Sequence, residues 1–213
     1  MSLFDDKVKK QLQEALKPMV NNVNLVMFTQ TLECNTCRDT HLFLREITEL
    51  SDKLSLTVWN FQTDRDKADM YGVDKIPAIV VLDSENKDHG IKFYGLPGGY
   101  EINSFLRSIL EMSGVKEPLP GAIADRIKGI KKDIHIQVFI SLTCPYCPDA
   151  VSAAHRLALE SEYIKADMVE SSTFVPVAIK YNVSSVPKTV INGTQEFVGS
   201  YPLDKVLDFV EKA

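Results

Sequence analysis

The hydrophobic and polar positions of the chain alternate between helical and extended patterns. From Phe4 to Met19 apolar residues recur every three or four positions, which is the spacing of one face of a helix. The segment NLVMFTQ at 24–30 is a short continuous apolar run, typical of a buried strand. A second helical pattern covers 38–54, and LSLTVWNFQ at 54–62 alternates as a strand does. These patterns predict a helix followed by a β-α-β unit.

The patterns continue to a hairpin and a closing helix. AIVVLD at 78–83 and IKFYG at 91–95 flank the turn-like SENKDHG, and 99–114 has a helical spacing that ends at Gly114. The same order recurs in the second half of the chain, where we predict a strand at 134–141, a helix at 149–162, a strand at 163–170, a hairpin at 188–200 and a helix at 203–213. Strands that alternate with helices indicate the α/β class.

This recurrence is an internal repeat of the sequence itself. A shift of 110 residues aligns, without a gap, Cys34 with Cys144, Cys37 with Cys147, and YGVDKIPAIVV (71–81) with YNVSSVPKTVI (181–191). A period of this length is a whole domain, because solenoid units repeat at about 20 to 50 residues. The segment 114–122, rich in Pro and Gly, separates the halves. We therefore predict two similar domains, 1–118 with a CNTC motif and 119–213 with a CPYC motif.

Composition and charge limit the kind of partner. The 213 residues are 45% hydrophobic, which is enough for a sizeable core, and they carry a net charge of −5. A nucleic acid is not expected as the main partner, because such proteins carry a basic surface that neutralises phosphates. No apolar run approaches a membrane span, and the N-terminal segment lacks the apolar core of a signal peptide. We therefore expect a cytoplasmic protein with no membrane partner.

The four cysteines form two CxxC pairs, each between a predicted strand and a predicted helix. Unpaired backbone N–H groups and the helix dipole stabilise a thiolate at such a turn, where a thiol one turn on can reach it. This position predicts Cys34 and Cys144 as nucleophiles, with Cys37 and Cys147, deeper in their helices, as resolving thiols. A zinc site is an alternative, but zinc-binding pairs usually lie about 15 to 20 residues apart. We therefore predict no metal.

The prolines complete the motif set. Pro77 and Pro187 each lie 43 residues after the first cysteine of their half, directly before a predicted strand. With the two CxxC pairs they make the sequence resemble the thioredoxin and glutaredoxin superfamily over essentially the whole chain. It is similar in particular to the two-domain protein disulfide oxidoreductases of thermophilic prokaryotes. The resemblance implies two tandem thioredoxin-like folds, each a central mixed β-sheet flanked by helices.

The resemblance also implies roles for single residues. All four cysteines would be redox-active. Pro77 and Pro187 would be cis, and the backbone of Ile76 and Val186 would pair with an extended substrate segment.

The sequence departs from thioredoxin beside both cysteine pairs. Phe28 and Val138 stand six residues before the first cysteines, where thioredoxin has a buried carboxylate, so proton transfer must use another group or water. Glu33 precedes Cys34 and should oppose its thiolate, although Arg38 offsets part of that charge, whereas the neutral Thr143 precedes Cys144. We therefore expect Cys144 to be the more reactive nucleophile.

Together these observations predict a protein dithiol-disulfide oxidoreductase that needs no cofactor and that reduces, oxidises or isomerises protein disulfides. An alternative is an electron carrier from a thioredoxin-reductase-like flavoprotein to a peroxiredoxin, like the related N-terminal domain of alkyl hydroperoxide reductase flavoproteins. The chain has no glycine-rich dinucleotide motif, so its electrons would come from another protein. A third alternative is a non-catalytic module that binds polypeptides or zinc.

Overall fold

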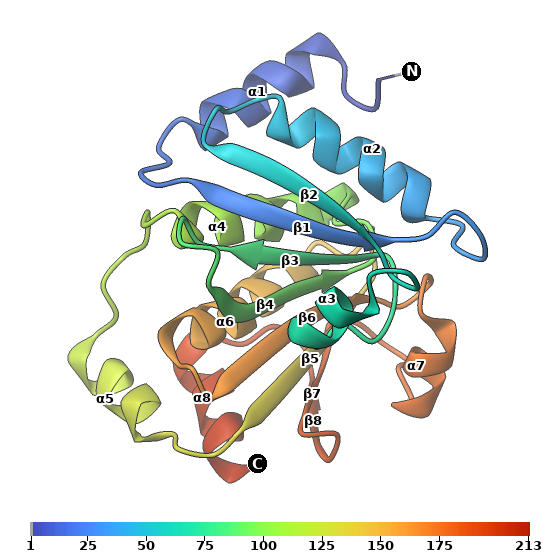
Figure 1. The fold of residues 1–213 in the computed structure, drawn as a ribbon. Coiled ribbons are helices and arrows are strands. Elements are labelled where there is room, and N and C mark those ends of the chain that lie inside the picture. The colour runs from blue at the N-terminus through green and yellow to red at the C-terminus, as the bar shows by residue number, and fades with distance from the viewer. Residues whose placement is uncertain (1) are drawn as a thin grey trace. The chain divides into compact units, whose positions relative to one another are not determined.

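The structure is a computed structural model that describes residues 2–213. Figure 1 labels the helices and strands of the described chain. The chain divides into two compact units. Unit 1 contains residues 2–88, 94–96 and 109–116, and unit 2 contains residues 89–93, 97–108 and 117–213.

Unit 1 contains three described strands, which lie in the order β2 (Leu54–Asn60), β1 (Val23–Thr29) and β3 (Ala78–Leu82). β1 pairs in parallel with β2 and antiparallel with β3, so the sheet is mixed. All of β3 and most of β1 are buried, which explains their continuous apolar sequences. Phe28 pairs with Ala78, and this register places the residue after Pro77 beside the end of β1 that leads to the first CxxC pair.

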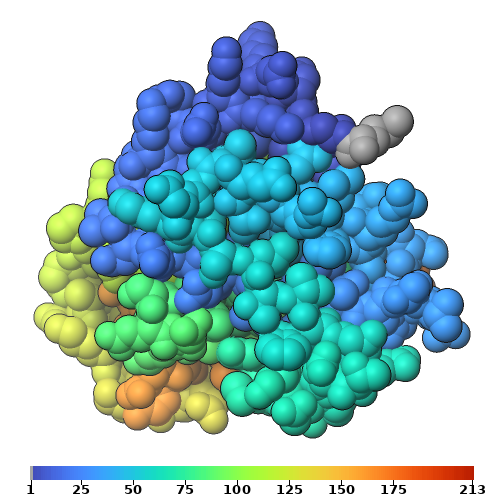
Figure 2. Space-filling view, turned by 45° about the horizontal axis from the view of Figure 1, so that its top comes forward, coloured from blue at the N-terminus to red at the C-terminus, as the bar shows by residue number. Residues whose placement is uncertain are grey.

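The helices of unit 1 include α1 (Asp6–Leu16), α2 (Cys37–Thr48) and α3 (Arg65–Met70). α1 begins where it does because the Asp5 carboxylate accepts a hydrogen bond from the Val8 N–H at 2.8 Å and caps the helix. α2 packs on β1 and β2 through an apolar face that includes Phe43, Leu44 and Ile47. Figure 2 shows part of the surface of unit 1, coloured blue to teal.

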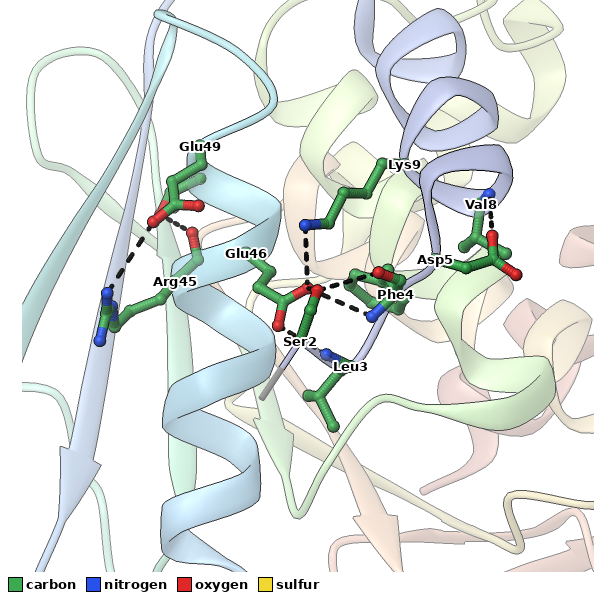
Figure 3. A network of polar contacts seen from close by, with 10 residues as sticks. Ser2, Leu3, Phe4, Asp5, Val8, Lys9, Arg45, Glu46 and Glu49 are labelled. Atoms are coloured by element: carbon green, nitrogen blue, oxygen red, sulfur yellow. Dashed lines mark hydrogen bonds and ion pairs between the residues drawn. The ribbon is translucent and has the colours of Figure 1, made fainter.

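One buried carboxylate fixes the amino-terminal segment to α2 (Figure 3). Glu46 accepts hydrogen bonds from the Leu3 N–H at 2.6 Å, the Ser2 hydroxyl at 2.7 Å and the Phe4 N–H at 3.2 Å, and Lys9 Nζ lies 3.8 Å away. Burial favours a higher pKa, but these hydrogen bonds and the Lys9 charge outweigh it and hold the pKa of Glu46 below its usual range. The network anchors the amino-terminal residues to the helix that begins at the first CxxC pair.

Unit 2 contains five described strands, in the order β4 (Asp88–Tyr94), β6 (Ile164–Glu170), β5 (Ile134–Ile140), β7 (Lys188–Ile191) and β8 (Gln195–Val198). β5 pairs in parallel with β6 and antiparallel with β7, and β7 pairs antiparallel with β8. This sheet is therefore mixed as well. Nearly every residue of β5 and β6 is buried, as expected for strands covered on both faces.

The central helix of unit 2 begins at the second CxxC pair and contacts several of the other helices. The 3-10 helix η1 (Gly99–Glu101) runs into α4 (Ile102–Met112), whose residues 102–108 belong to this unit, and η1 contacts α6 (Cys147–Glu160). α6 packs on β5 and β6 and against α8 (Leu203–Lys212). α5 (Gly121–Gly129) is tied to α8 by Arg126, which forms ion pairs with Asp208 at 2.7 Å and Glu211 at 2.8 Å.

The predicted fold is confirmed: the chain is an α/β protein with two tandem thioredoxin-like folds, and the predicted strands and long helices lie within a few residues of their expected positions. The sequence pattern did not predict the short helices α3, α5 and α7 (Val175–Lys180). None of the described residues of α7 is buried, so this helix has no buried apolar face that would produce a helical pattern in the sequence. Residues 89–93 and 97–108 belong to unit 2, so a domain boundary at 118/119 stays a prediction. Over residues 2–213, no helix has the length and apolarity that crossing a membrane requires.

Candidate active site

Both CxxC pairs are disulfides in the structure. Cys34 is bonded to Cys37 and Cys144 to Cys147, and the Cα atoms are 5.5 Å apart in each pair. α2 begins at Cys37 and α6 at Cys147, so the second cysteine of each pair is the first helical residue and not, as predicted, a deeper one. The first cysteine therefore lies in front of the helix, where the unpaired N–H groups of the first turn favour a negative sulfur.

The second cysteines are shielded more than the first. Cys37 and Cys147 are 2% and 0% exposed, whereas Cys144 is 8% exposed and Cys34 is half-buried. A nucleophile must reach the substrate sulfur, while a resolving thiol needs to reach only its partner in the same pair. This difference in exposure agrees with the predicted division of roles.

The prolines lie where the motif set requires them. The Ile76–Pro77 and Val186–Pro187 peptide bonds are both cis, as the resemblance implies. In unit 2 the Cys144 sulfur lies 3.8 Å from the carbonyl oxygen of Val186, so the cysteine pair and the proline segment form one site. We refer to this as site 2, and to the corresponding cysteines and proline of unit 1 as site 1.

A buried acid that the sequence pattern did not reveal lies next to site 2. Glu101, in η1, is 0% exposed, and the Ser104 hydroxyl donates a hydrogen bond to its Oε2 at 2.5 Å. Its Oε1 has no hydrogen-bond partner among residues 2–213. Burial raises the pKa of Glu101 to about 7, the Ser104 hydrogen bond opposes this, and the negative charge of Asp149 adds to it.

The backbone holds Glu101 against the site 2 loop. The Tyr100 N–H donates a hydrogen bond to the Leu142 carbonyl at 3.0 Å, two residues before Cys144. Gly99 has a φ of +56° and approaches the Leu142 backbone so closely that a Cβ would clash with the carbonyl oxygen. η1 also contacts α6, the helix that begins at Cys147, and the negative charge of Asp149 in the first turn of that helix acts on Glu101. The hydrophobic and polar pattern of the chain did not indicate this buried carboxyl beside the site 2 loop.

The signal for Glu101 in the sequence is weak. The residue lies 43 positions before Cys144 and belongs by the repeat to the first half, whereas thioredoxin supplies its acid from the strand before the cysteine pair. The glycine pair at 98–99 marks the tight approach, but a glycine pair alone predicts no more than a turn. The acid could be assigned to site 2 only after the backbone contact to Leu142 was known.

Two histidines of the helices that follow the CxxC pairs, His155 and His41, have different surroundings. His155 is fully buried, its Nδ1 lies 3.0 Å from the Ser108 hydroxyl, and its ring packs edge-on against Phe93. Burial lowers the pKa of His155 to about 4, although the Asp167 charge opposes this, so the ring is neutral at pH 7. His41 is half-buried and lines a shallow groove with β2. Within residues 2–213, no three or more His, Cys, Asp and Glu side chains are grouped as metal ligands would be.

Known proteins resemble the chain along nearly its whole length. The family model described as "Thioredoxin domain" matches residues 134–210. A protein disulfide oxidoreductase from Aeropyrum pernix is 31% identical, with a TM-score of 0.91 over 99% of this chain and 94% of that one. A structure of the alkylhydroperoxide reductase AhpF from Enterococcus faecalis is 30% identical, with a TM-score of 0.91 over 97% of this chain and 99% of that one.

Curated relatives extend beyond the matched region. The AhpF-type alkyl hydroperoxide reductase of Staphylococcus aureus is 28% identical over 205 residues, which are 96% of this chain and 37% of the relative. The chain therefore spans little more than a third of the length of the curated relatives it matches.

Proposed function

The chain belongs to the protein disulfide oxidoreductases of the thioredoxin superfamily and is a thiol-disulfide oxidoreductase. We propose that it exchanges disulfides with protein substrates at both CxxC sites. The substrates are polypeptides that carry a disulfide or a dithiol. Reduction, oxidation and isomerisation all follow from the same exchange steps. The observation that carries the proposal is the contact of the Cys144 sulfur with the Val186 carbonyl, 3.8 Å apart, which joins the reactive pair to a segment able to bind an extended backbone.

In the reducing direction, Cys144 starts the reaction as a thiolate. Its sulfur attacks one sulfur of the substrate disulfide, a mixed disulfide forms, and the first substrate cysteine leaves as a thiolate that takes up a proton. Cys147 then loses its proton and attacks the Cys144 sulfur. The second substrate thiol is released, and the Cys144–Cys147 disulfide seen in the structure is formed. At site 1, Cys34 and Cys37 perform the same steps.

Glu101 supplies the proton transfer at site 2. Its pKa of about 7 lets it accept the proton of the resolving thiol at neutral pH and return it when the disulfide is reduced again. The site 2 nucleophile is preceded by neutral Thr143, whereas the exposed Glu33 precedes Cys34, which supports site 2 as the more reactive pair.

The substrate backbone binds at the proline segments. The residues Ile76 and Val186, each followed by a cis-proline, present main-chain groups at the ends of β3 and β7, and an extended peptide pairs with them as with a strand edge. The exposed Tyr146, inside the second CxxC pair, offers an aromatic contact to the same peptide. The cytoplasm, with its pool of reduced thiols, is the compartment we propose for this chemistry.

The proposal is tested with insulin reduction by dithiothreitol and with the refolding of scrambled ribonuclease. The wild type is compared with Cys34→Ser, Cys144→Ser and the double variant. We expect the double variant to lose both activities and Cys144→Ser to lose more than Cys34→Ser. Equal activity in all four proteins would contradict the proposal and favour a module that binds polypeptides without catalysis, which a peptide-binding assay on the double variant would then detect.

A second function has support from the similarity to the alkyl hydroperoxide reductases of the AhpF type. In this function the chain carries electrons from a thioredoxin-reductase-like flavoprotein to a peroxiredoxin. Stopped-flow mixing of the oxidised chain with a reduced flavoprotein of that type separates the two functions. A site 2 disulfide that is reduced much faster by the flavoprotein than by substrate dithiols would favour the carrier.

A further inference from the structure

The loop before the first cysteine is covered in unit 2 and open in unit 1. The repeat places Leu32 in the position of Leu142. In unit 2, η1 lies against the Leu142 backbone through Gly99 and Tyr100. In unit 1, Leu32 is 76% exposed. An apolar side chain that is this exposed, two residues before a reactive cysteine, is available to a bound molecule.

A pocket of about 560 Å³ lies beside this exposed loop, lined by Gln30, Thr31, Leu32, Glu33, Asn60 and Gln62. Four of these residues follow β1 and lead to Cys34, and the other two lie at the end of β2 and just after it. The volume is sufficient for one long side chain of a polypeptide. Its position next to Cys34 means that this side chain would be close in sequence to the cysteine being attacked.

The lining of the pocket favours a cation. Glu33 is its charged group and is exposed, and its carboxylate forms no hydrogen bond or ion pair with any residue from 2 to 213. Gln30 and Gln62 add amide oxygens, and no lysine or arginine belongs to the lining. Arg38, the nearest basic residue in sequence, lies beyond the CxxC pair in α2.

The corresponding positions of unit 2 lack this character. Thr143 replaces Glu33, and Glu170 replaces Asn60. The Glu170 carboxylate is buried and accepts hydrogen bonds from the Ser172 N–H and hydroxyl and from the Thr173 N–H, so it is not free to bind a ligand. The negative, open pocket is therefore a property of site 1.

We infer that this pocket binds a lysine or arginine side chain of the substrate, next to the disulfide cysteine that Cys34 attacks. The aliphatic stem packs on Leu32, and the cationic group binds the Glu33 carboxylate with support from the glutamine amides. Glu33 thus lowers the intrinsic reactivity of Cys34 while it selects basic substrates for site 1. The inference rests on the proposed function, because it requires Cys34 to attack polypeptide disulfides.

The test uses a Cys144→Ala, Cys147→Ala chain, in which site 1 is the reactive pair. Its substrates are homodimeric disulfides of the capped tripeptide X-Cys-Gly, with X as Lys, Gln or Glu. Cys34 and Cys37 reduce each disulfide to two peptide thiols and form their own disulfide, and peptide thiol is quantified after alkylation. Each rate is divided by the rate of the same substrate with dithiothreitol, which removes the effect of X on the chemistry of the substrate itself. The neutral bis(2-hydroxyethyl) disulfide reports exchange without any charge.

We expect the Lys substrate to react about three- to tenfold faster than the Glu substrate at low salt, and this ratio to shrink at about 0.5 M salt. Glu33→Gln should bring the ratio close to one, Glu33→Lys should invert it, and Asp39→Asn, which removes an exposed charge of α2 outside the pocket, should preserve it. The same ratio in wild type and Glu33→Gln would overturn the inference while leaving the proposed function intact. No reaction with any substrate, including the neutral disulfide, would overturn both for site 1.

Discussion

Replacing Glu101 with Gln should make the stability of the protein less dependent on pH, because the burial of this carboxyl opposes its ionisation. The pKa of Glu101 is raised from 4.5 to about 7 in the folded chain. The folded state therefore binds more protons than the unfolded state between these values, and stability falls as the pH rises through them. At about 1.4 kcal/mol per pKa unit, the full loss in the wild type is about 3 kcal/mol.

The assay is urea unfolding of the oxidised wild type and of Glu101→Gln, followed by circular dichroism at pH 4.5 and pH 8.5 and at one ionic strength. The glutamine has the shape of the protonated acid, so the two proteins should be similar at pH 4.5. At pH 8.5 the variant should be more stable by about 2 to 3 kcal/mol. Insulin reduction should move the other way, with a loss in Glu101→Gln that is largest near neutral pH, because the resolving thiol has lost its proton acceptor. An equal change in stability with pH for both proteins would refute the reasoning.

Three further variants test how the sites are held. Gly99→Ala forces a Cβ onto the Leu142 carbonyl, so it should lower the free energy of unfolding by about 1 to 3 kcal/mol and reduce site 2 activity. The control Gly193→Ala, at a φ of +72° but with room for a Cβ, should keep that activity. Glu46→Gln should lower the free energy of unfolding by about 1 to 2 kcal/mol at pH 7, measured by thermal unfolding. Because the pKa of Glu46 is lowered in the folded chain, the ionised carboxylate stabilises the fold above that pKa, and the difference in stability between wild type and variant should close as the pH falls through it. Because buried His155 stays neutral, the wild type should lose about 3 kcal/mol of stability as the pH falls from 6.5 to about 4. In urea titrations His155→Asn should show a smaller loss of stability over this pH range, and an equal loss in both proteins would assign it to other groups.

The parts of the fold that repeat locally could be predicted from the sequence. β1 and β5 consist mostly of apolar residues, and the helices that follow them carry apolar residues at helical spacing, so their positions depend on local pattern and burial. The spacing of 43 residues between cysteine and proline occurs in both halves, and the prolines are cis in both. The strands, the helices that follow them and the cysteine–proline spacing could therefore be recognised because each occurs at the same place in both halves of the sequence.

The parts that depend on tertiary contacts could not be predicted. Glu101 lies beside the site 2 loop because Gly99, which has no Cβ, lets η1 approach the Leu142 backbone. Trp59 and Phe61 alternate as core residues would, yet both are half-buried and lie against the cationic side chains of Lys67 and Arg65. The alternation along a strand predicts which face of the sheet a side chain lies on, but it does not predict which other residues cover that face.

Disulfide exchange at the first cysteines can be tested by trapping the reaction after its first step. In the Cys37→Ser, Cys147→Ser chain, the resolving thiols are gone, so attack by Cys34 or Cys144 on a substrate disulfide should stop at the mixed disulfide. The reduced variant is incubated with insulin, quenched with acid and digested, and its cysteine peptides are identified by mass spectrometry. We expect insulin chains linked to Cys144 and, more slowly, to Cys34. Cysteines that remain unmodified, while insulin is still reduced or bound, would contradict it.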